Sequence, residues 1–590
     1  MSEPHRVVMA RMSSDLAAIS AYVNRVSADL AELHRTFEQA PVPPPLPAPP
    51  TMSTPWVAAV PSVPQQPVAA PRRERSEGWI GKALAVAGVT VTLTGVVLLL
   101  VLAAQAGILR PEFRVAAGAV LAVGLLGVGW RLHRRTGGRV GAIAVAATGV
   151  AAAYIDVIAV TTIYDWVTAP VGLASAAAIG ACGLTLARRW NSEPLALLVL
   201  LPLIALAPVV TDGVTLLLIG FMLALSAAAL PAQLGRDWLR LHAARVAAPT
   251  LPLVMALGAA SINGRHDLML ALTCGLAAVL ALTGGLLVLR STTNPAATAI
   301  LTAVGVLPVL SVAAAVDRAI AALLAAALAA ALVAIVALGE RVPGLSLVVR
   351  QVWSVLAAAA ALIAVLVAFD GPVAGPVLLA MATVVAIAGR RRGVTRWIAV
   401  GLAVAGGMIY LDVAGPETLL DATELSVGLT VSVLIGSFLA IAAAAAIAWA
   451  FSADGEADHE VGRLVWVFAA VAAGYAVTMF TVTAGVVVGG TGAGFFAGHM
   501  AATICWIAVA AGLLGHAGRR PREQRSLPIG GGMALVAAAM AKLFLFDLGT
   551  LDGMFRVAVF IVVGLALLGM GAAYARLLNQ QDRAVDGQPL

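Results

Sequence analysis

Residues 319–338 read AIAALLAAALAAALVAIVAL, a run without a single charged residue. An α-helix rises about 1.5 Å per residue, so a run of this length can cross the hydrocarbon core of a bilayer, which is about 30 Å thick. Similar runs recur from Trp79 to the end of the chain. We therefore predict an all-α, polytopic integral membrane protein, because a helix satisfies its own backbone hydrogen bonds in lipid.

The overall composition supports this prediction. Of the 590 residues, 61% are hydrophobic and 11% are charged, and the mean hydropathy is +0.97. Soluble proteins carry about 25% charged residues, so the composition excludes a soluble multidomain enzyme. We expect the lipid bilayer as the partner of these segments, and we do not expect nucleic acid, although the net charge is +7.

Hydropathy predicts about eighteen spans between residues 79 and 577. The predicted spans are 79–103, 113–132, 139–163, 168–187, 193–210, 213–230, 246–262, 267–289, 295–316, 317–338, 346–368, 372–389, 394–413, 425–451, 462–488, 495–515, 527–546 and 554–577. With a cytoplasmic N-terminus, most of the 37 Lys and Arg residues fall in inside segments, as the positive-inside rule requires. We therefore predict that both chain ends are cytoplasmic, with residues 578–590 as a short cytoplasmic tail.

Two segments precede the first predicted span. Across residues 9–37, apolar residues recur alternately every three and four positions, which predicts a coiled-coil helix within 1–40 and a homo-oligomer formed through it. The alternative is a single amphipathic helix that docks on the membrane or on the protein's own loops. Residues 41–78 are rich in proline, so we expect an extended tether that leads to the transmembrane domain, 79–577.

Asp156 is the first candidate site residue, because charge inside a membrane is costly and marks function by default. It lies in the sequence AAAYID, about two turns from the predicted outer end of the span 139–163. An aspartate at this depth faces a partner, a water-filled cavity or the protein interior. The alternative is a shallow position from which the carboxylate reaches water at the headgroups.

A second group of candidates lies in KLFLFDLGTLDGMFR, residues 542–556. Lys542, Asp547, Asp552 and Arg556 place two cations and two anions in one predicted outer hairpin. They either tie two helices together or line a substrate or proton path.

His499 is the remaining candidate, and it follows a glycine-rich loop at the predicted outer ends of two spans. The glycines of this loop follow no strand, so we expect them to allow close helix packing and not to bind phosphate. They are Gly489, Gly490, Gly492, Gly494 and Gly498.

Further aspartates lie near the predicted outer ends of the helices. We expect most of them to cap helices and turns, since Asp is a favoured N-cap residue; the alternative is a ring of carboxylates that binds cations, amines or sugar hydroxyls. They include Asp165, Asp212, Asp267, Asp317, Asp370 and Asp412.

The cysteines and histidines predict no metal site and no cofactor. Cys182, Cys274 and Cys505 each lie alone in an apolar run, so we expect small buried core residues and no disulfide. The histidines show neither HxxxH nor HExxH spacing.

Three stretches carry a family resemblance: WIGKA at 79–83, AATGVAAAY at 146–154 and KLFLFDLGTLDGMFRVAVF at 542–560. Together with the heptad helix and the proline-rich tether, they resemble a bacterial predicted membrane protein family, domain of unknown function 2339. The resemblance implies a multi-pass protein of the bacterial inner (cell) membrane, and it implies no established activity.

Three functions remain open at this point. The first is a transporter or flippase-like protein of the cell envelope, with Asp156, Lys542, Asp547 and Arg556 on the wall of an outer cavity. The second is a membrane-embedded enzyme that acts on a lipid-linked substrate with outer carboxylates as acid or base. The third is an oligomerising scaffold. Polytopic glycosyltransferases usually have a large first outer loop with acidic residues, whereas this loop is short and Glu112 is its only acidic residue, which argues against the enzyme.

Overall fold

The structure is a computed structural model, and it describes most of the chain beyond residue 109. The chain divides into two compact units, Met1–Glu74 and Arg75–Leu590, and all described residues lie in the second. The predicted coiled-coil helix and proline-rich tether lie outside the described residues. The described ranges, apart from a few single residues, are 110–135, 138–263, 267–339, 344–452, 460–518, 526–547 and 556–569.

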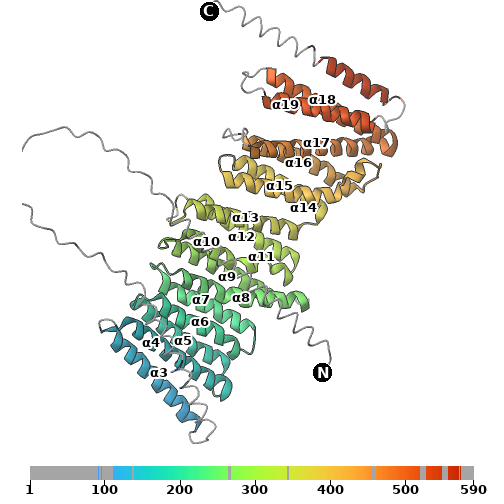
Figure 1. The fold of residues 1–590 in the computed structure, drawn as a ribbon. Coiled ribbons are helices and arrows are strands. Elements are labelled where there is room, and N and C mark those ends of the chain that lie inside the picture. The colour runs from blue at the N-terminus through green and yellow to red at the C-terminus, as the bar shows by residue number, and fades with distance from the viewer. Residues whose placement is uncertain are drawn as a thin grey trace, which may run out of the picture. The chain divides into compact units, whose positions relative to one another are not determined.

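Every regular element in these ranges is a helix, which confirms the predicted all-α fold (Figure 1). Alanine and leucine dominate these segments and are the strongest helix formers. The α-helices are α3 Pro111–His133, α4 Arg139–Ile158, α5 Ala169–Arg189, α6 Glu193–Val210, α7 Leu216–Gln233, α8 Leu239–Asn263, α9 Leu268–Leu289, α10 Pro295–Gly305, α11 Leu307–Leu310, α12 Arg318–Ala337, α13 Leu347–Ala368, α14 Gly371–Ala388, α15 Gly393–Val413, α16 Val427–Phe451, α17 Glu460–Gly489, α18 Phe495–Gly518 and α19 Ser526–Lys542. The π-helical segments are η1 Ala159–Ile163, η5 Gly490–Gly494 and η7 Leu543–Asp547, and the 3-10 segments are η2 Val312–Ala314 and η3 Pro416–Leu419.

The described residues contain 13 helices that are long and apolar enough to cross a membrane. The predicted count of eighteen is not confirmed by them. The stretch Glu460–Ala517 is one of the 13, although it contains two helices, α17 and α18, that pack against each other. Three predicted spans appear as apolar helices shorter than 18 residues, near 295–316, 527–546 and 554–577.

Packing follows the order of the chain. Helices that are neighbours in sequence form hairpins, as in α3–α4, α12–α13 and α14–α15 (Figure 1), and α4 to α9 also contact the helix after next. Buried alanine, leucine and valine side chains form one cluster over α4–α8, a second over α7–α13 and a third over α13–α17.

Small residues let these helices approach closely. A Cβ added to Gly149 on α4 would lie 2.9 Å from the carbonyl oxygen of Ala122 on α3, and one added to Gly406 on α15 would lie 3.0 Å from that of Gly375 on α14. Lipid tails are as apolar as leucine, so van der Waals contact of this kind, and not the hydrophobic effect, holds membrane helices together.

Large apolar side chains cover the outer surface of the helices. Ile262 is 86% exposed, Val488 is 89% exposed and Leu545 is 85% exposed. Exposed apolar surface of this kind marks contact with a membrane or with another protein surface. Cys182 is exposed as well, so the prediction that all three cysteines are buried is wrong for this one, whereas Cys274 is buried.

Two helix boundaries differ from the sequence-based prediction. The span predicted at 246–262 begins at Leu239, and it continues through Pro249 and Pro252. The span predicted at 295–316 is instead broken into α10, α11 and η2. Pro308, at the start of α11, has no backbone N–H with which to continue the hydrogen-bond ladder of α10.

Candidate functional site

The side chain of Lys542 lies between α18 and α19. Its amine donates hydrogen bonds to the carbonyl oxygen of His499, at 3.2 Å, and to the hydroxyl of Thr503, at 2.9 Å. Lys542 is half-buried, whereas His499 and Thr503 are buried at 2% and 0% exposure. The structure thus joins two candidates, Lys542 and His499, that the sequence analysis placed in separate groups.

The local sequence explains why His499 lies at this position. Gly498 lets α18 approach α17 so closely that a Cβ on it would lie 2.6 Å from the carbonyl oxygen of Thr481. The imidazole of His499 packs edge-on against the ring of Phe495, with 4.6 Å between the ring centroids. Thr503 donates its hydroxyl proton to the same His499 carbonyl oxygen that accepts from Lys542.

The predicted role of the glycine-rich loop in helix packing is confirmed for three of its glycines. Added Cβ atoms on Gly489, Gly494 and Gly498 would all lie less than 3.0 Å from backbone atoms of the facing helix or turn. Gly490 serves differently, since its φ of +72° is a left-handed conformation that favours glycine.

A π-helical segment lies beside each of the three intramembrane candidates described by the structure. η1 begins three residues after Asp156, η7 begins directly after Lys542, and η5 ends five residues before His499. A π turn leaves the regular helical hydrogen-bond pattern, and such turns are frequent at functional sites.

The other members of the predicted C-terminal charge group are only partly described. Asp547 ends η7, but its side chain lies outside the described residues, as does the whole of Asp552. Arg556 is half-buried at the start of the last described helix. The four-charge hairpin therefore stays a prediction.

Asp156 occupies a different packing environment. Its carboxylate lies against Gly118 of α3, where an added Cβ would meet Asp156 Oδ2 at 2.6 Å. Oδ2 is buried and has no hydrogen-bond partner among the described residues. Its helix α4 packs against α3, α5 and α6, whereas α19 packs against α18. The structure does not bring Asp156 to the side chain of Lys542.

Asp267 confirms the predicted capping role. It is the N-cap residue of α9, and its Oδ1 accepts hydrogen bonds from the backbone N–H groups of Met269, at 2.9 Å, and Leu270, at 3.2 Å. Asp165 and Asp212 lie in the connections between helices and have φ angles of 51° each. Asp tolerates this left-handed conformation better than most residues.

Asp370 departs from the predicted capping role. It occupies the N-cap position of α14 but makes no capping hydrogen bond with its side chain. Its carboxylate instead pairs with the guanidinium of Arg318 at 3.0 Å, and the two side chains are 79% and 69% exposed. An exposed ion pair contributes about 0–1 kcal/mol to stability.

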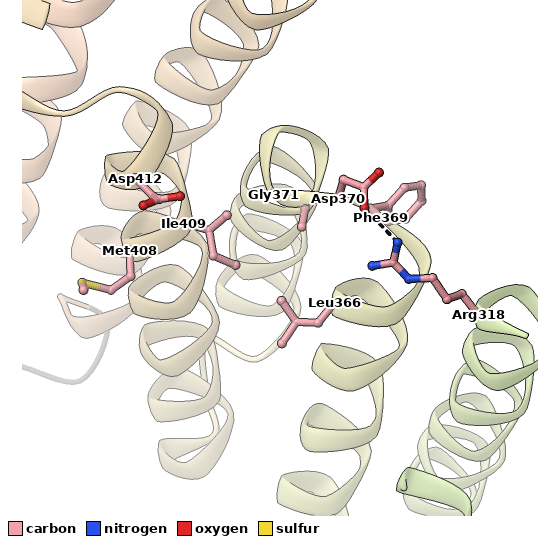
Figure 2. Close-up of a pocket in the computed structure, with 9 residues that line it drawn as sticks. Arg318, Leu366, Phe369, Asp370, Gly371, Met408, Ile409 and Asp412 are labelled. Atoms are coloured by element: carbon pink, nitrogen blue, oxygen red, sulfur yellow. Dashed lines mark hydrogen bonds and ion pairs between the residues drawn. The ribbon is translucent and has the colours of Figure 1, made fainter. Parts of the chain in front are cut away.

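This ion pair lies at the edge of an open pocket of about 420 Å³ between α12, α13, α14 and α15. Figure 2 shows Arg318 pointing toward Asp370, with Asp412 on the neighbouring α15. The remaining lining is mostly apolar and consists of Leu366, Phe369, Gly371, Ala374, Met408 and Ile409. A pocket with charged side chains at its edge and an otherwise apolar lining suits an amphipathic molecule.

No group of three His, Cys, Asp or Glu side chains gathers in the described part of the chain in a way that could hold a metal ion.

One polar cluster was missed by the sequence analysis. Gln233, His242, Arg245, Thr298 and Thr302 are all at most 1% exposed, and they come together from α7, α8 and α10. Arg245 falls between the predicted spans 213–230 and 246–262, which placed it in a cytoplasmic loop. The spacing of His242 and Arg245 could have indicated the cluster, because residues three positions apart lie on the same face of a helix. Both residues precede the predicted start of this span at residue 246.

Comparison with known proteins identifies one family. The chain matches the family described as "Predicted membrane protein (DUF2339)" over residues 81–435 and 368–577. No curated protein matches the chain. No solved structure matches it.

Proposed function

The chain belongs to the DUF2339 family of predicted membrane proteins, and we propose that it is a transporter or flippase-like protein of the cell envelope. In this proposal Lys542, His499 and Thr503 contact the transported molecule between α18 and α19. Asp547, Asp552 and Arg556 follow Lys542 along the chain, and the proposal keeps them as predicted members of the same path.

The hydrogen bonds of Lys542 are the observation that carries this proposal. An ammonium group in a membrane helix is expensive and is retained where it faces partners or a pathway. Here it bonds to a backbone carbonyl and a hydroxyl on the neighbouring helix. The π segments η5 and η7 next to this pair supply the irregular backbone that functional sites in membrane helices commonly use.

The enzyme alternative requires a free outer carboxylate as acid or base. Two of the candidates have other roles, because Asp267 accepts two backbone hydrogen bonds and Asp370 pairs with Arg318. These two carboxylates are therefore not available for acid or base catalysis in the enzyme alternative.

The proposed orientation places both chain ends in the cytoplasm of a bacterial cell. In that orientation Lys542 and His499 lie in the outer half of the membrane, where a molecule bound between α18 and α19 would exchange with the outer leaflet. A homo-oligomer through residues 9–37 is a separate proposal and is not required for this site.

The test compares envelope lipids and metabolites of a deletion strain with those of strains that carry variants. We expect the wild type, Lys542→Arg and Ala541→Met to restore the wild-type profile, and Lys542→Met to fail. Ala541 is the exposed neighbour of Lys542, so Ala541→Met controls for adding a methionine to this helix. Every variant must reach the membrane at the wild-type level. Full restoration by Lys542→Met would overturn the proposal.

A second arm uses Asp156→Asn. If Asp156 belongs to the same transport path, this variant also fails to restore the profile. Restoration by Asp156→Asn together with failure of Lys542→Met would limit the path to α18 and α19.

A further inference from the structure

The buried cluster around Arg245 forms one continuous hydrogen-bond chain across α7, α8 and α10. Arg245 Nε donates to Gln233 Oε1 at 3.3 Å, and Arg245 Nη2 bonds to His242 Nδ1 at 3.0 Å. His242 Nε2 lies 3.4 Å from the hydroxyl of Thr302, which donates to the carbonyl oxygen of Thr298 at 2.8 Å.

The guanidinium determines which atom donates and which accepts in these hydrogen bonds. Arginine has only donors, so Nδ1 of His242 must accept and its Nε2 must carry the proton. His242 therefore donates to Thr302 and is uncharged in this arrangement. The other neighbour, Gln233, uses its carbonyl oxygen for Arg245 and its amide for the carbonyl oxygen of Trp238, at 3.0 Å.

The positive charge of Arg245 has no carboxylate partner in this cluster. Nη1 is buried and makes no hydrogen bond to any described residue. The guanidinium packs directly against Gly284 of α9, where an added Cβ would lie 2.6 Å from Nη1 and Nη2. A buried cation without a counter-charge is strongly unfavourable, so this site favours an anion.

The acidic side chain of the loop before α8 is committed elsewhere. Asp237, in the loop between α7 and α8, accepts hydrogen bonds from the hydroxyls of Thr293 and of Thr292, the latter at 3.0 Å. It is exposed, whereas Arg245 is 1% exposed. It therefore ties two loops together at the surface and does not neutralise the buried guanidinium.

We propose that Arg245, with His242 and Thr302, binds a phosphate oxyanion that enters from the side of the α7–α8 and α9–α10 loops. Guanidinium groups match phosphate oxygens in geometry and charge. The imidazole N–H now donates to Thr302 and the Thr302 hydroxyl donates to the carbonyl oxygen of Thr298, and in the proposal both protons turn to the oxyanion when it binds. The ligand is either free phosphate or the phosphate of a lipid headgroup.

The break after α10 gives the oxyanion a route to this site. α10 ends at Gly305, and the chain continues as the separate short helix α11. Because α10 is separate from α11, it can move away from α8 without unwinding a continuous helix. The contact that this movement would break, between His242 and Thr302, is the longest hydrogen bond in the cluster. Discontinuous helices line binding sites in many transporters in this way.

The test follows thermal unfolding of the purified full-length protein. In one arm, phosphate is added to protein in detergent, with sodium chloride of equal ionic strength as the comparison. In the other arm, the protein is placed in phosphatidylcholine nanodiscs with or without phosphatidic acid. The first arm reports free phosphate, and the second reports a lipid phosphate.

Gln233→Glu is the decisive variant, because it keeps the shape of the side chain and gives Arg245 a carboxylate partner. Arg245→Gln removes the cation, and Arg240→Gln is the matched control on the exposed face of the same helix. We expect a saturable rise in Tm for the wild type and Arg240→Gln in at least one arm, and no such rise for Gln233→Glu.

If Arg245→Gln does not fold, Gln233→Glu still decides the outcome. The proposal is overturned if the wild type shows no rise in either arm, or if Gln233→Glu rises as much as the wild type. Neither outcome depends on the transport assay proposed for Lys542.

Discussion

Replacing Gly498 by alanine tests whether the contact between α17 and α18 positions the candidate site. A Cβ at this position would lie 2.6 Å from the carbonyl oxygen of Thr481 and 2.6 Å from the Cα of Val482. Both atoms belong to backbone, so a side-chain rotation cannot relieve the clash. Ordinary contact begins at 3.4 Å, so the two helices must separate by roughly 0.8 Å at this point.

Overpacking of this kind costs about 1–3 kcal/mol, and we expect a loss of stability in that range. Because His499 follows Gly498 directly, the same displacement shifts the carbonyl oxygen that accepts from Lys542. The assay is equilibrium unfolding of the purified full-length protein in mixed micelles of mild detergent and SDS.

The matched control is Gly492→Ala in the preceding segment η5, where an added Cβ would meet nothing within 4 Å. We expect this variant to stay within about 0.5 kcal/mol of the wild type. Equal free energies of unfolding for Gly498→Ala and Gly492→Ala would refute the reasoning, because the close approach of the two backbones would then have no energetic consequence.

Three further predictions concern one helix end and two loops. Asp267→Ala removes the acceptor for two backbone N–H groups at the start of α9 and should lower the free energy of unfolding by about 1 kcal/mol; Asp267→Asn, a good cap, should lose less in the same unfolding assay. Hydrogen bonds from the hydroxyls of Thr293 and Thr292 lower the pKa of Asp237 below its usual value, so its contribution to stability is present above about pH 4 and is lost as the pH falls further. The difference in Tm between the wild type and Asp237→Asn should therefore shrink in acid, and a difference that grows in acid would contradict the assignment. A cysteine at Thr423, in the loop between α15 and α16, should react with a membrane-impermeant maleimide added to intact cells, and labelling only after lysis would reverse the proposed orientation.

The helices were predictable because their cause is local. A run such as 319–338 contains no charge, and in lipid its backbone has no other way to satisfy its hydrogen bonds. The same local reasoning found Asp267 as a cap, since an aspartate before an apolar run is a capping signal. It placed the start of α8 too late, because hydropathy windows stop at charges and Arg245 is buried by other helices.

The candidate site was predictable only residue by residue. Lys542 and His499 were both recognised as costly groups at membrane depth, but their contact joins positions 43 residues apart. Nothing in the local sequence pairs them. Asp370 was assigned to capping for the same reason, because its partner Arg318 is 52 residues away in the chain.

The amino-acid sequence by itself determined that the chain is a multi-pass α-helical membrane protein of the DUF2339 family. Only the tertiary structure decided which helix faces meet, that Cys182 is exposed, and that Gln233, His242 and Arg245 share one buried cluster. The physical reason is the solvent. In water an apolar stripe shows which face of a helix is buried, but in lipid both faces are apolar. The pairing of helix faces therefore depends on small residues and on a few polar groups whose partners lie on other helices.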